Sequence, residues 1–270
     1  KRTAFLDSGS SISYDAISFN VGSEIPIEAI EGAAEHAWPV KPVRNLWWLR
    51  ARLEKLGSQK FRPLRVVVIG GGATGCEIAC NINQLASDLG LNLRVLLVSS
   101  HHRLLQEHNA LAARRVYSAL RERGIAVKLQ GRITKVTPRH VFDEDGKRLR
   151  ADVTVLANGL RPPAQLQRLG LTLGIEGGLA VGPCLNSPDD PRIFGAGDCV
   201  DFSERRLPKL GVFAVRQSPI LLHNLLASVE ERSLKAYRPQ RVWLSILNLG
   251  RGEGMALWGP LFWRGRLSMT

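Results

Sequence analysis

Short, mainly apolar runs alternate with segments in which apolar residues recur every three or four positions. The apolar runs, each interrupted by a single Lys or Arg, are Leu64–Ile69, Leu93–Val98 and Ile125–Leu129. Their length and β-branched content predict strands buried on both faces of a parallel sheet. The periodic segments run from Ile78 to Leu89 and over Leu111–Arg123, and each is followed by a glycine, which predicts two helices. The order strand, helix, strand, helix, strand predicts an α/β fold.

Other segments predict the elements that flank this unit. Leucines at three- and four-residue steps in Val43–Leu56 predict an amphipathic helix closed by Gly57, and Pro39 and Pro42 exclude a helix directly before it. The remaining predicted elements are strands within residues 1–23, a hairpin over Arg132–Phe142, strands at Asp152–Leu156 and Arg192–Gly195, a helix over roughly Val215–Glu231 and a β-rich piece from Arg238 onward.

Composition narrows the class of protein. The 270 residues are 44% hydrophobic and 23% charged, which is typical of a globular protein, and no apolar run reaches the length of a membrane-spanning helix. The net charge of +13 is interpreted first as a solvated surface and second as attraction to an anionic membrane surface. Cys76 and Cys80 share one face of a predicted helix; we interpret them as core residues, expect no metal site, and expect a reducing compartment.

A glycine-rich turn joins the first predicted strand to the helix that follows. Gly70–Gly75 fits the pattern G-x-G-x-x-G in the context that a dinucleotide-binding turn requires. In such a turn Gly70 permits the tight bend, Gly72 lets the backbone approach a pyrophosphate, and Gly75 lets helix and strand pack closely. The free N–H groups of the helix then face the phosphates. The alternative is a glycine turn with a purely structural role.

The end of the second predicted strand lacks the acidic residue that usually binds the ribose of NAD. In its place stand Ser99, Ser100, His101, His102 and Arg103, three of which are potential cations or donors. This departure leaves NADP open, because a 2′-phosphate needs hydrogen-bond donors and positive charge. The alternative is an exposed polar loop that contacts no nucleotide.

The segment Phe194–Cys199 resembles the second flavin motif of flavoproteins with two dinucleotide-binding domains. This family includes pyridine nucleotide–disulfide reductases, type II NADH dehydrogenases and sulfide:quinone reductases. Three further stretches resemble the family in the same order: Val21–Ser23, Ala157–Gly159 (with Asn158 where the family has Thr) and Pro208–Gln217. The similarity is greatest to type II NADH dehydrogenases, including those associated with selenide, water dikinase, and is carried by Ala214–Gln217 and Leu244–Gly250.

This resemblance implies a flavin-dependent oxidoreductase that transfers hydride from NAD(P)H to FAD and passes the electrons to an acceptor, expected to be a quinone. It places Asp198 on the ribityl chain of FAD, and it makes Glu77, near the nicotinamide, and Gln217, beside the acceptor, the candidate catalytic residues. The alternative for Glu77 is a solvated first-turn acid, and for Gln217 a polar contact to flavin or backbone. The other candidate cofactor-binding residues are Gly22, Gly70, Gly71, Gly72, Ala73, Thr74, Gly75, Ser99, Ser100, Arg103, Asn158, Gly159, Gly197, Lys209, Ala214 and Val215.

The resemblance also divides the chain into domains. It predicts a Rossmann-like NAD(P)H-binding domain with its linker helix at residues 44–158, inserted in a partial FAD-binding domain at residues 1–43 and 159–237. Residues 238–270 are predicted to begin a β-rich C-terminal interface domain. Because residues 1–60 contain no G-x-G-x-x-G, we expect a native chain that is longer at both ends, and weak FAD retention by these 270 residues alone.

Partners are predicted by the same resemblance. We expect a cytoplasmic protein with no nucleic-acid partner. Peripheral attachment to the inner face of the membrane, through a further C-terminal segment, is left open, and so is a homodimer. Two other functions remain. One is a soluble NAD(P)H reductase of a protein partner such as a ferredoxin, for which the basic C-terminal third would be the docking face. The other is a catalytically silent nucleotide-binding module.

Overall fold

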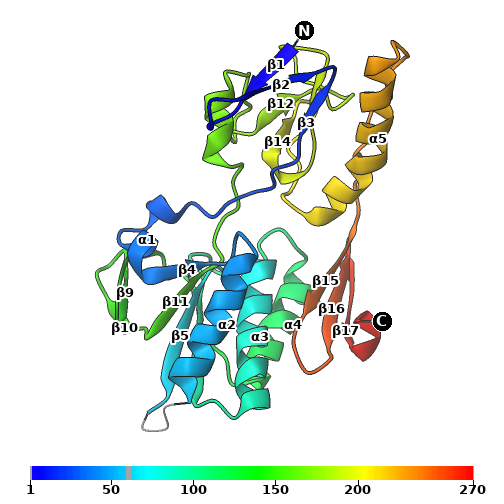
Figure 1. Ribbon diagram of the computed structural model, residues 1–270. Helices are drawn as coiled ribbons and strands as arrows, with labels where there is room; N and C mark the ends of the chain where they lie inside the picture. The colour runs from blue at the N-terminus through cyan, green and yellow to red at the C-terminus, as the bar shows by residue number, and fades with distance from the viewer. Residues whose placement is uncertain (1, 59–61, 270) are drawn as a thin grey trace. The chain divides into compact units, whose positions relative to one another are not determined.

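The computed structural model describes residues 2–58 and 62–269, which form two compact units (Figure 1). The first unit contains the residues up to 24 and residues 160–241, and the second contains residues 25–159 and the residues from 242 onward. The domain boundaries predicted above assign each part of the chain to the cofactor that it would bind, and they stay a prediction. The division by compactness differs from them, because residues 25–43 and the C-terminal strands belong to the second unit.

A five-stranded parallel sheet forms the centre of the second unit, in the order β4-β11-β5-β6-β7. Its strands are Ala37–Pro39 (β4), Val153–Leu156 (β11), Leu64–Ile69 (β5), Leu93–Val98 (β6) and Ala126–Lys128 (β7). The predicted strands β5 and β6 are confirmed residue for residue, and so is the α/β class. Strand β4 was not predicted, because three residues ending in a proline carry no periodic signal; a proline is tolerated there because β4 lies at the sheet edge.

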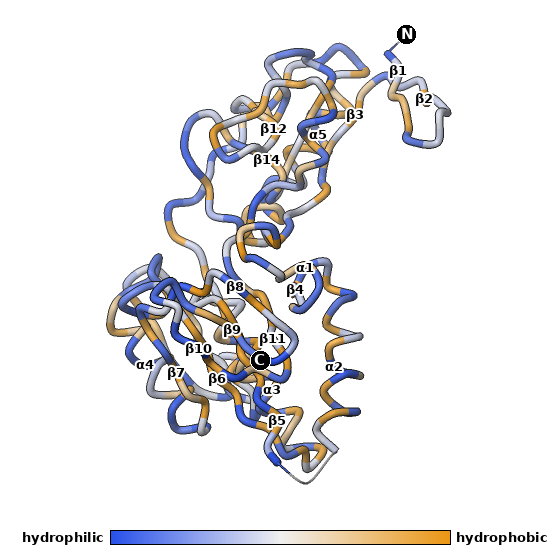
Figure 2. Tube along the Cα trace, turned by 90° about the vertical axis from the view of Figure 1, so that its left-hand side faces the viewer, coloured by the Kyte–Doolittle hydropathy of each residue, from blue (hydrophilic) through white to orange (hydrophobic). Residues whose placement is uncertain are grey.

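The helices of the second unit are α1 (Ala33–His36), α2 (Arg44–Gly57), α3 (Ala73–Leu89) and α4 (Ala110–Glu122), with a 3-10 turn at Ile27–Ala29. Along α2 hydrophobic and hydrophilic residues alternate, and Leu49 and Leu53 form its buried stripe (Figure 2). Helix α3 ends at Gly90, which adopts the left-handed conformation that glycine tolerates best. The side chain of Asn109 starts α4 by accepting the N–H of Leu111 at 2.7 Å.

Two antiparallel sheets complete the second unit. Strands β8 (Ile133–Thr137), β9 (His140–Asp143) and β10 (Arg148–Arg150) extend the predicted hairpin by one strand. Strands β15 (Leu244–Asn248), β16 (Gly254–Trp258) and β17 (Leu261–Gly265) form the other sheet, followed by a 3-10 turn at Arg266–Ser268. Strand β15 lies against α3, so the C-terminal strands pack on the parallel-sheet unit.

The first unit is built from short strand pairs and one long helix. The pairs are β1 (Arg2–Phe5) with β2 (Ser11–Tyr14), β3 (Ile17–Phe19) with β13 (Ile193–Gly195), and β12 (Leu179–Val181) with β14 (Val200–Phe202). Phe194, Leu179 and Leu185 are fully buried at the centre of its core. Short 3-10 helices span Ala164–Leu169 and Gly197–Cys199.

Helix α5 of the first unit covers Gly211–Val229 and therefore begins four residues before the predicted start at Val215. The sequence interpretation placed Pro208–Gly211 in the loop before the helix. At the first position of a helix a glycine costs little, because the first-turn N–H groups have no partner in the helix whichever residue is present. Pro219 lies inside α5.

Candidate functional site

The glycines of the β5–α3 turn differ in what surrounds them. Gly70 has φ +129°, and a Cβ built on it would lie 2.4 Å from the carbonyl oxygen of Ala157. A Cβ on Gly75 would lie 1.8 Å from the carbonyl oxygen of Gly70, which is far inside contact distance. One on Gly71 would meet the Ser99 hydroxyl at 2.3 Å. These three glycines are therefore required by the packing of the turn itself.

Gly72 is the exception, because a Cβ there would meet no atom within 4 Å. It is the N-cap of α3, with extended backbone and no side chain capping the helix. The N–H groups of Ala73, Thr74 and Gly75 have no acceptor in residues 2–58 and 62–269. Open space in front of three free N–H groups, at the positive end of a 17-residue helix, is the geometry that binds a phosphate.

A hollow of about 490 Å³ opens beside this turn, at the edge of the sheet where β5, β6 and β11 end; we call it the carboxyl-edge hollow. Its lining residues are Ala29, Ile30, Ile69, Gly70, Val98, Ser100, His101, Gly131, Arg132, Ile133, Glu144 and Asn158. Oδ1 of Asn158 is buried and lacks a hydrogen-bond partner in the part of the chain that the structure describes. The next residue, Gly159, has φ +47°. Because buried polar atoms are usually hydrogen-bonded, this unpartnered amide oxygen is suited to accept a hydrogen bond from a polar ligand in the hollow.

The loop after β6 holds only one of its candidate donors at the hollow. Ser100 lines the hollow, whereas Ser99 is buried under the turn and accepts the N–H of His101 at 3.3 Å. The guanidinium of Arg103 donates to the carbonyl oxygens of Leu105 at 3.2 Å, His108 at 2.9 Å and Gln106 at 2.5 Å. These bonds hold Arg103 on its own loop, so its present role is to fix the loop.

His101, from the polar loop considered in the sequence, also lines the hollow, and so does Arg132, which the sequence interpretation did not name. Arg132 is exposed and has no carboxylate partner in the described residues. It precedes β8, far along the chain from the glycine turn, and only the return of the chain after β7 brings it to this edge. No local spacing rule could have found it.

Glu77 is half-buried and hydrogen-bonded. Its Oε1 accepts the backbone N–H of Asn248, at the end of β15, at 2.8 Å. Burial raises the pKa of the Glu77 carboxyl, and the N–H of Asn248 acts in the opposite direction. Glu77 therefore joins α3 to the C-terminal strands.

Cys76 and Cys80 behave as core residues. Burial raises the pKa of Cys76, and it raises the pKa of Cys80 to about 11, so both thiols are protonated and unreactive. No cluster of His, Cys, Asp and Glu that could hold a metal occurs in the described chain. Within the same residues no helix is both long and apolar enough to cross a membrane.

In the first unit the segment after β13 forms a tight polar turn. Gly197 has φ +78° and donates its N–H to Oε1 of Gln217 at 2.7 Å. Ser23, beside Gly22 (φ +73°), donates its hydroxyl to Oδ2 of Asp198 at 2.7 Å. The structure thus brings the predicted Gly22 region, Gly197, Asp198 and Gln217 together from three separate parts of the chain.

Lys209 and helix α5 follow this turn. Nζ of Lys209 donates to the carbonyl oxygen of Val200 at 3.0 Å and lies 3.3 Å from both Asp201 and Glu176, so its charge is neutralised inside the unit. No acidic residue or side-chain cap occupies the first turn of α5, and the N–H groups of Gly211 and Val212 have no acceptor among the described residues.

The other α5 candidates stand further along the helix. Ala214 and Val215 are its fourth and fifth residues, and the Val215 side chain is exposed. The Gln217 side chain is fully buried, and its Nε2 has no partner in the described part of the chain. The observed contact of Gln217 is therefore with the backbone, which is one of the two roles considered from the sequence.

Comparison with known proteins gives a family and a set of relatives. The family model described as pyridine nucleotide-disulphide oxidoreductase matches residues 1–218. The type II NADH:quinone oxidoreductase of Haemophilus influenzae is 27% identical over 206 residues, covering 69% of this chain and 46% of that protein. The alternative NAD(P)H-ubiquinone oxidoreductase C1 of Arabidopsis thaliana is 24% identical over 293 residues, covering 96% of this chain and 56% of that protein. The chain thus spans about half the length of the curated relatives it matches.

A solved structure agrees in fold. NDH2 of Plasmodium falciparum in complex with NADH superposes with a TM-score of 0.81 at 14% identity, covering 99% of this chain and 75% of that one. The sulfide:quinone oxidoreductase of Aquifex aeolicus gives 0.78 at 16% identity, with 99% and 68% covered. At such identities the likeness concerns the fold alone.

Proposed function

Because the chain belongs to the pyridine nucleotide-disulphide oxidoreductase family, we propose that it is the nucleotide-binding part of a flavin-dependent enzyme that passes electrons from NAD(P)H to a quinone. The observation that carries the proposal is the open N-terminus of α3, where Gly72 leaves room in front of the free N–H groups of Ala73, Thr74 and Gly75. The relatives from H. influenzae and A. thaliana are named for quinone reduction, which supports the choice of acceptor.

The nucleotide would bind in the second unit. Its pyrophosphate would accept the N–H groups at the start of α3, and its adenosine end would enter the carboxyl-edge hollow, where Ser100 and Arg132 offer donors. Asn158 would accept a hydrogen bond from the ligand through its unpartnered Oδ1. Residues from the ends of three strands would therefore hold one ligand, as open parallel sheets commonly do.

FAD would be held by the first unit, whose residues fit it in two respects. The first turn of α5 presents free N–H groups and contains no acidic residue, and the buried Nε2 of Gln217 lacks a partner in the described chain. When bound, FAD accepts hydride from a reduced nicotinamide and delivers electrons to an acceptor. Asp198 would accept a hydrogen bond from it, and the N–H groups of Gly211 and Val212 would stabilise negative charge.

The quinone, the cytoplasmic location with peripheral membrane contact, and the homodimer remain parts of this proposal. Gln217 has a different role in it from the one first considered. Because its amide is buried and supports Gly197, it would position the flavin turn instead of touching the acceptor.

The test uses the complete enzyme, loaded with FAD and assayed with NADH, NADPH and a water-soluble quinone. We expect turnover with at least one nucleotide, and we expect Gly72→Asp to abolish flavin reduction in stopped flow. Gln217→Leu should lower flavin content and slow both half-reactions together. Failure of the wild-type enzyme to reduce quinone would refute the proposed acceptor. A Gln217→Leu enzyme slowed only in flavin reoxidation would place Gln217 beside the acceptor after all.

A further inference from the structure

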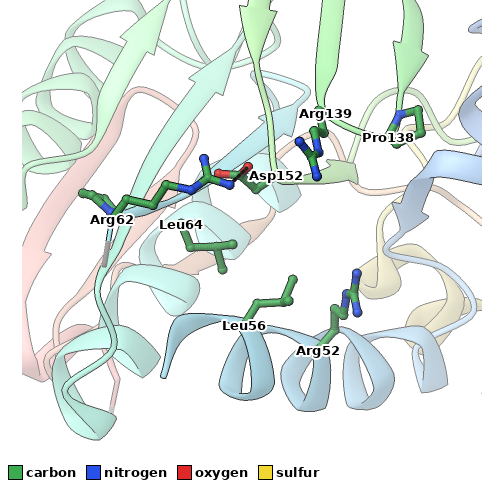
Figure 3. A pocket seen from close by; sticks show the side chains of 8 residues that line it. Arg52, Leu56, Arg62, Leu64, Pro138, Arg139 and Asp152 are labelled. Carbon is green, nitrogen blue, oxygen red and sulfur yellow. Dashed lines mark ion pairs between the residues drawn. The ribbon is translucent and has the colours of Figure 1, made fainter. Parts of the chain in front are cut away.

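A second hollow, of about 440 Å³, lies at the opposite edge of the parallel sheet, where β5 and β11 begin; we call it the amino-edge hollow. Four segments of the second unit line it: Arg52 and Leu56 from α2, residues 62–64 before and at the start of β5, Pro138 and Arg139 from the β8–β9 turn, and Asp152 before β11 (Figure 3). Because β5 is six residues long, this hollow is about 20 Å along the strand from the glycine turn. The two hollows are therefore separate sites.

The charges in the amino-edge hollow do not balance. Three arginines line it, and Asp152 is its one carboxylate. The carboxylate of Asp152 already accepts the N–H of Arg65 at 3.0 Å and contacts Arg62 at 3.4 Å and Arg150 at 3.5 Å. Arg52 and Arg139 have no carboxylate partner in residues 2–58 and 62–269. Positive charge therefore accumulates in a concave space, where the field is concentrated.

The side chains are also arranged for a ligand. Arg52 rises from α2, Arg139 reaches in from the strand turn facing it, and Arg62 is held in place beside Asp152 (Figure 3). Leu56 and Leu64 give the space between them an apolar floor. Guanidinium groups bind phosphate oxygens in pairs of hydrogen bonds, and this volume is typical of pockets for organic ligands.

We propose that the amino-edge hollow binds a phosphate-bearing organic anion, with Arg52 and Arg139 as the groups that its phosphate neutralises. Arg62 would orient that phosphate while remaining paired with Asp152. The apolar floor would take the organic part of the ligand. A phosphorylated metabolite and an anionic phospholipid headgroup share this chemistry, and the experiment separates them. The site is independent of the proposed oxidoreductase function.

The test measures binding instead of turnover, in a complete enzyme that carries Gly72→Asp, so that phosphates cannot use the α3 site. Two charges are removed by the pair Arg52→Gln and Arg139→Gln. The matched control, Arg114→Gln with Arg115→Gln, removes two exposed charges from α4, outside both hollows. The probes are pyrophosphate, followed by calorimetry, and phosphatidylcholine vesicles with and without phosphatidylglycerol, followed by co-sedimentation.

We expect the Arg52/Arg139 pair to lower affinity for at least one probe tenfold or more, and the control to leave it nearly unchanged. Loss for pyrophosphate would identify a soluble phosphate ligand, and loss for phosphatidylglycerol vesicles alone would identify a lipid headgroup. If both pairs of substitutions weaken binding equally, or if neither probe binds, the hollow is an ordinary basic surface and the proposal is wrong. Unchanged thermal unfolding of both variants excludes misfolding as the cause.

Discussion

At the scale of single residues, Gly72 and Gly75 separate binding from packing. A side chain on Gly75 must displace the carbonyl of Gly70, whereas one on Gly72 enters open space. Gly75→Ala should therefore lower the free energy of unfolding by roughly 1–3 kcal/mol, as overpacking typically does. Gly72→Asp should keep or slightly raise stability, because an aspartate at this extended N-cap position accepts the free N–H groups of α3.

The same Gly72→Asp carboxylate should abolish NAD(P)H binding, because it occupies the N–H groups and repels the pyrophosphate. Thermal unfolding and nucleotide fluorescence titration measure the two effects. Normal nucleotide affinity in Gly72→Asp would show that the α3 N-terminus is not the binding site.

We expect the choice between NADH and NADPH to depend on Arg132 more than on Arg103. Arg132 lines the carboxyl-edge hollow, whereas Arg103 is bound to three carbonyl oxygens of its own loop. A charge-assisted hydrogen bond to a 2′-phosphate contributes on the order of 1.5–3 kcal/mol, or roughly tenfold or more in affinity. Arg132→Gln should therefore weaken NADPH binding by that factor and leave NADH binding nearly unchanged.

Arg103→Gln is the control for Arg132→Gln. It should lower thermal stability without changing the preference between the two nucleotides. Dissociation constants of the complete enzyme for NADH and NADPH decide the matter. An NADPH preference lost in Arg103→Gln and kept in Arg132→Gln would restore the assignment made from the sequence.

At the scale of elements, the burial of Glu77 where α3 packs against β15 makes stability depend on pH. The folded-state pKa of Glu77 is raised above its ordinary value of 4.5, chiefly because the carboxyl is buried. A raised folded pKa means that the protonated form favours folding, and this contribution is lost as the pH rises through that pKa. Glu77→Gln keeps the oxygen that accepts the Asn248 N–H but never ionises.

The unfolding temperature of Glu77→Gln should therefore exceed that of the wild type at neutral pH, and the difference should shrink as the pH falls toward 4.5 and be absent below it. Asp143 offers a control of opposite sign, because the hydrogen bond from Lys128 lowers its pKa. Asp143→Asn should be less stable than the wild type at neutral pH, with a difference that disappears in acid. A pH-independent difference for Glu77→Gln would mean that the carboxyl is not buried in solution.

The elements also show what the sequence could predict. Strands β5 and β6 were predicted with correct ends because each is an apolar run, interrupted by a single arginine, between residues that favour turns, so local pattern and tertiary burial agree. The glycine turn was found for the same reason. Arg132 and the amino-edge hollow depend on which distant segments the fold brings together, and no spacing along the chain encodes that. Arg103 was predicted to bind the nucleotide because it follows β6 closely, but its guanidinium donates instead to carbonyl oxygens of its own loop.

At the scale of the whole molecule, the C-terminal strands belong energetically to the parallel-sheet unit. Leu247, Leu249 and Met255 are almost completely buried. Arg123 of the second unit, just after α4, has a side chain only 4% exposed and pairs with Glu253 at 2.8 Å. Burying each large apolar side chain contributes about 1.5–3 kcal/mol, so removing these strands removes several kcal/mol of favourable burial from the second unit.

Deleting the residues from 242 onward should therefore unfold the second unit, because the deletion exposes apolar surface on α3 and leaves Arg123 buried without its carboxylate. Hydrogen exchange followed by mass spectrometry would show this as lost protection in β5 and β6, with protection of β12 and β13 in the first unit retained. Deleting residues 2–14 is the matched control: β1 and β2 pair only with each other in the described sheets, so β5 and β6 should stay protected. If the C-terminal deletion leaves β5 and β6 protected, the strands form a separate domain and the boundary predicted at residue 238 describes the molecule better than its compact units do.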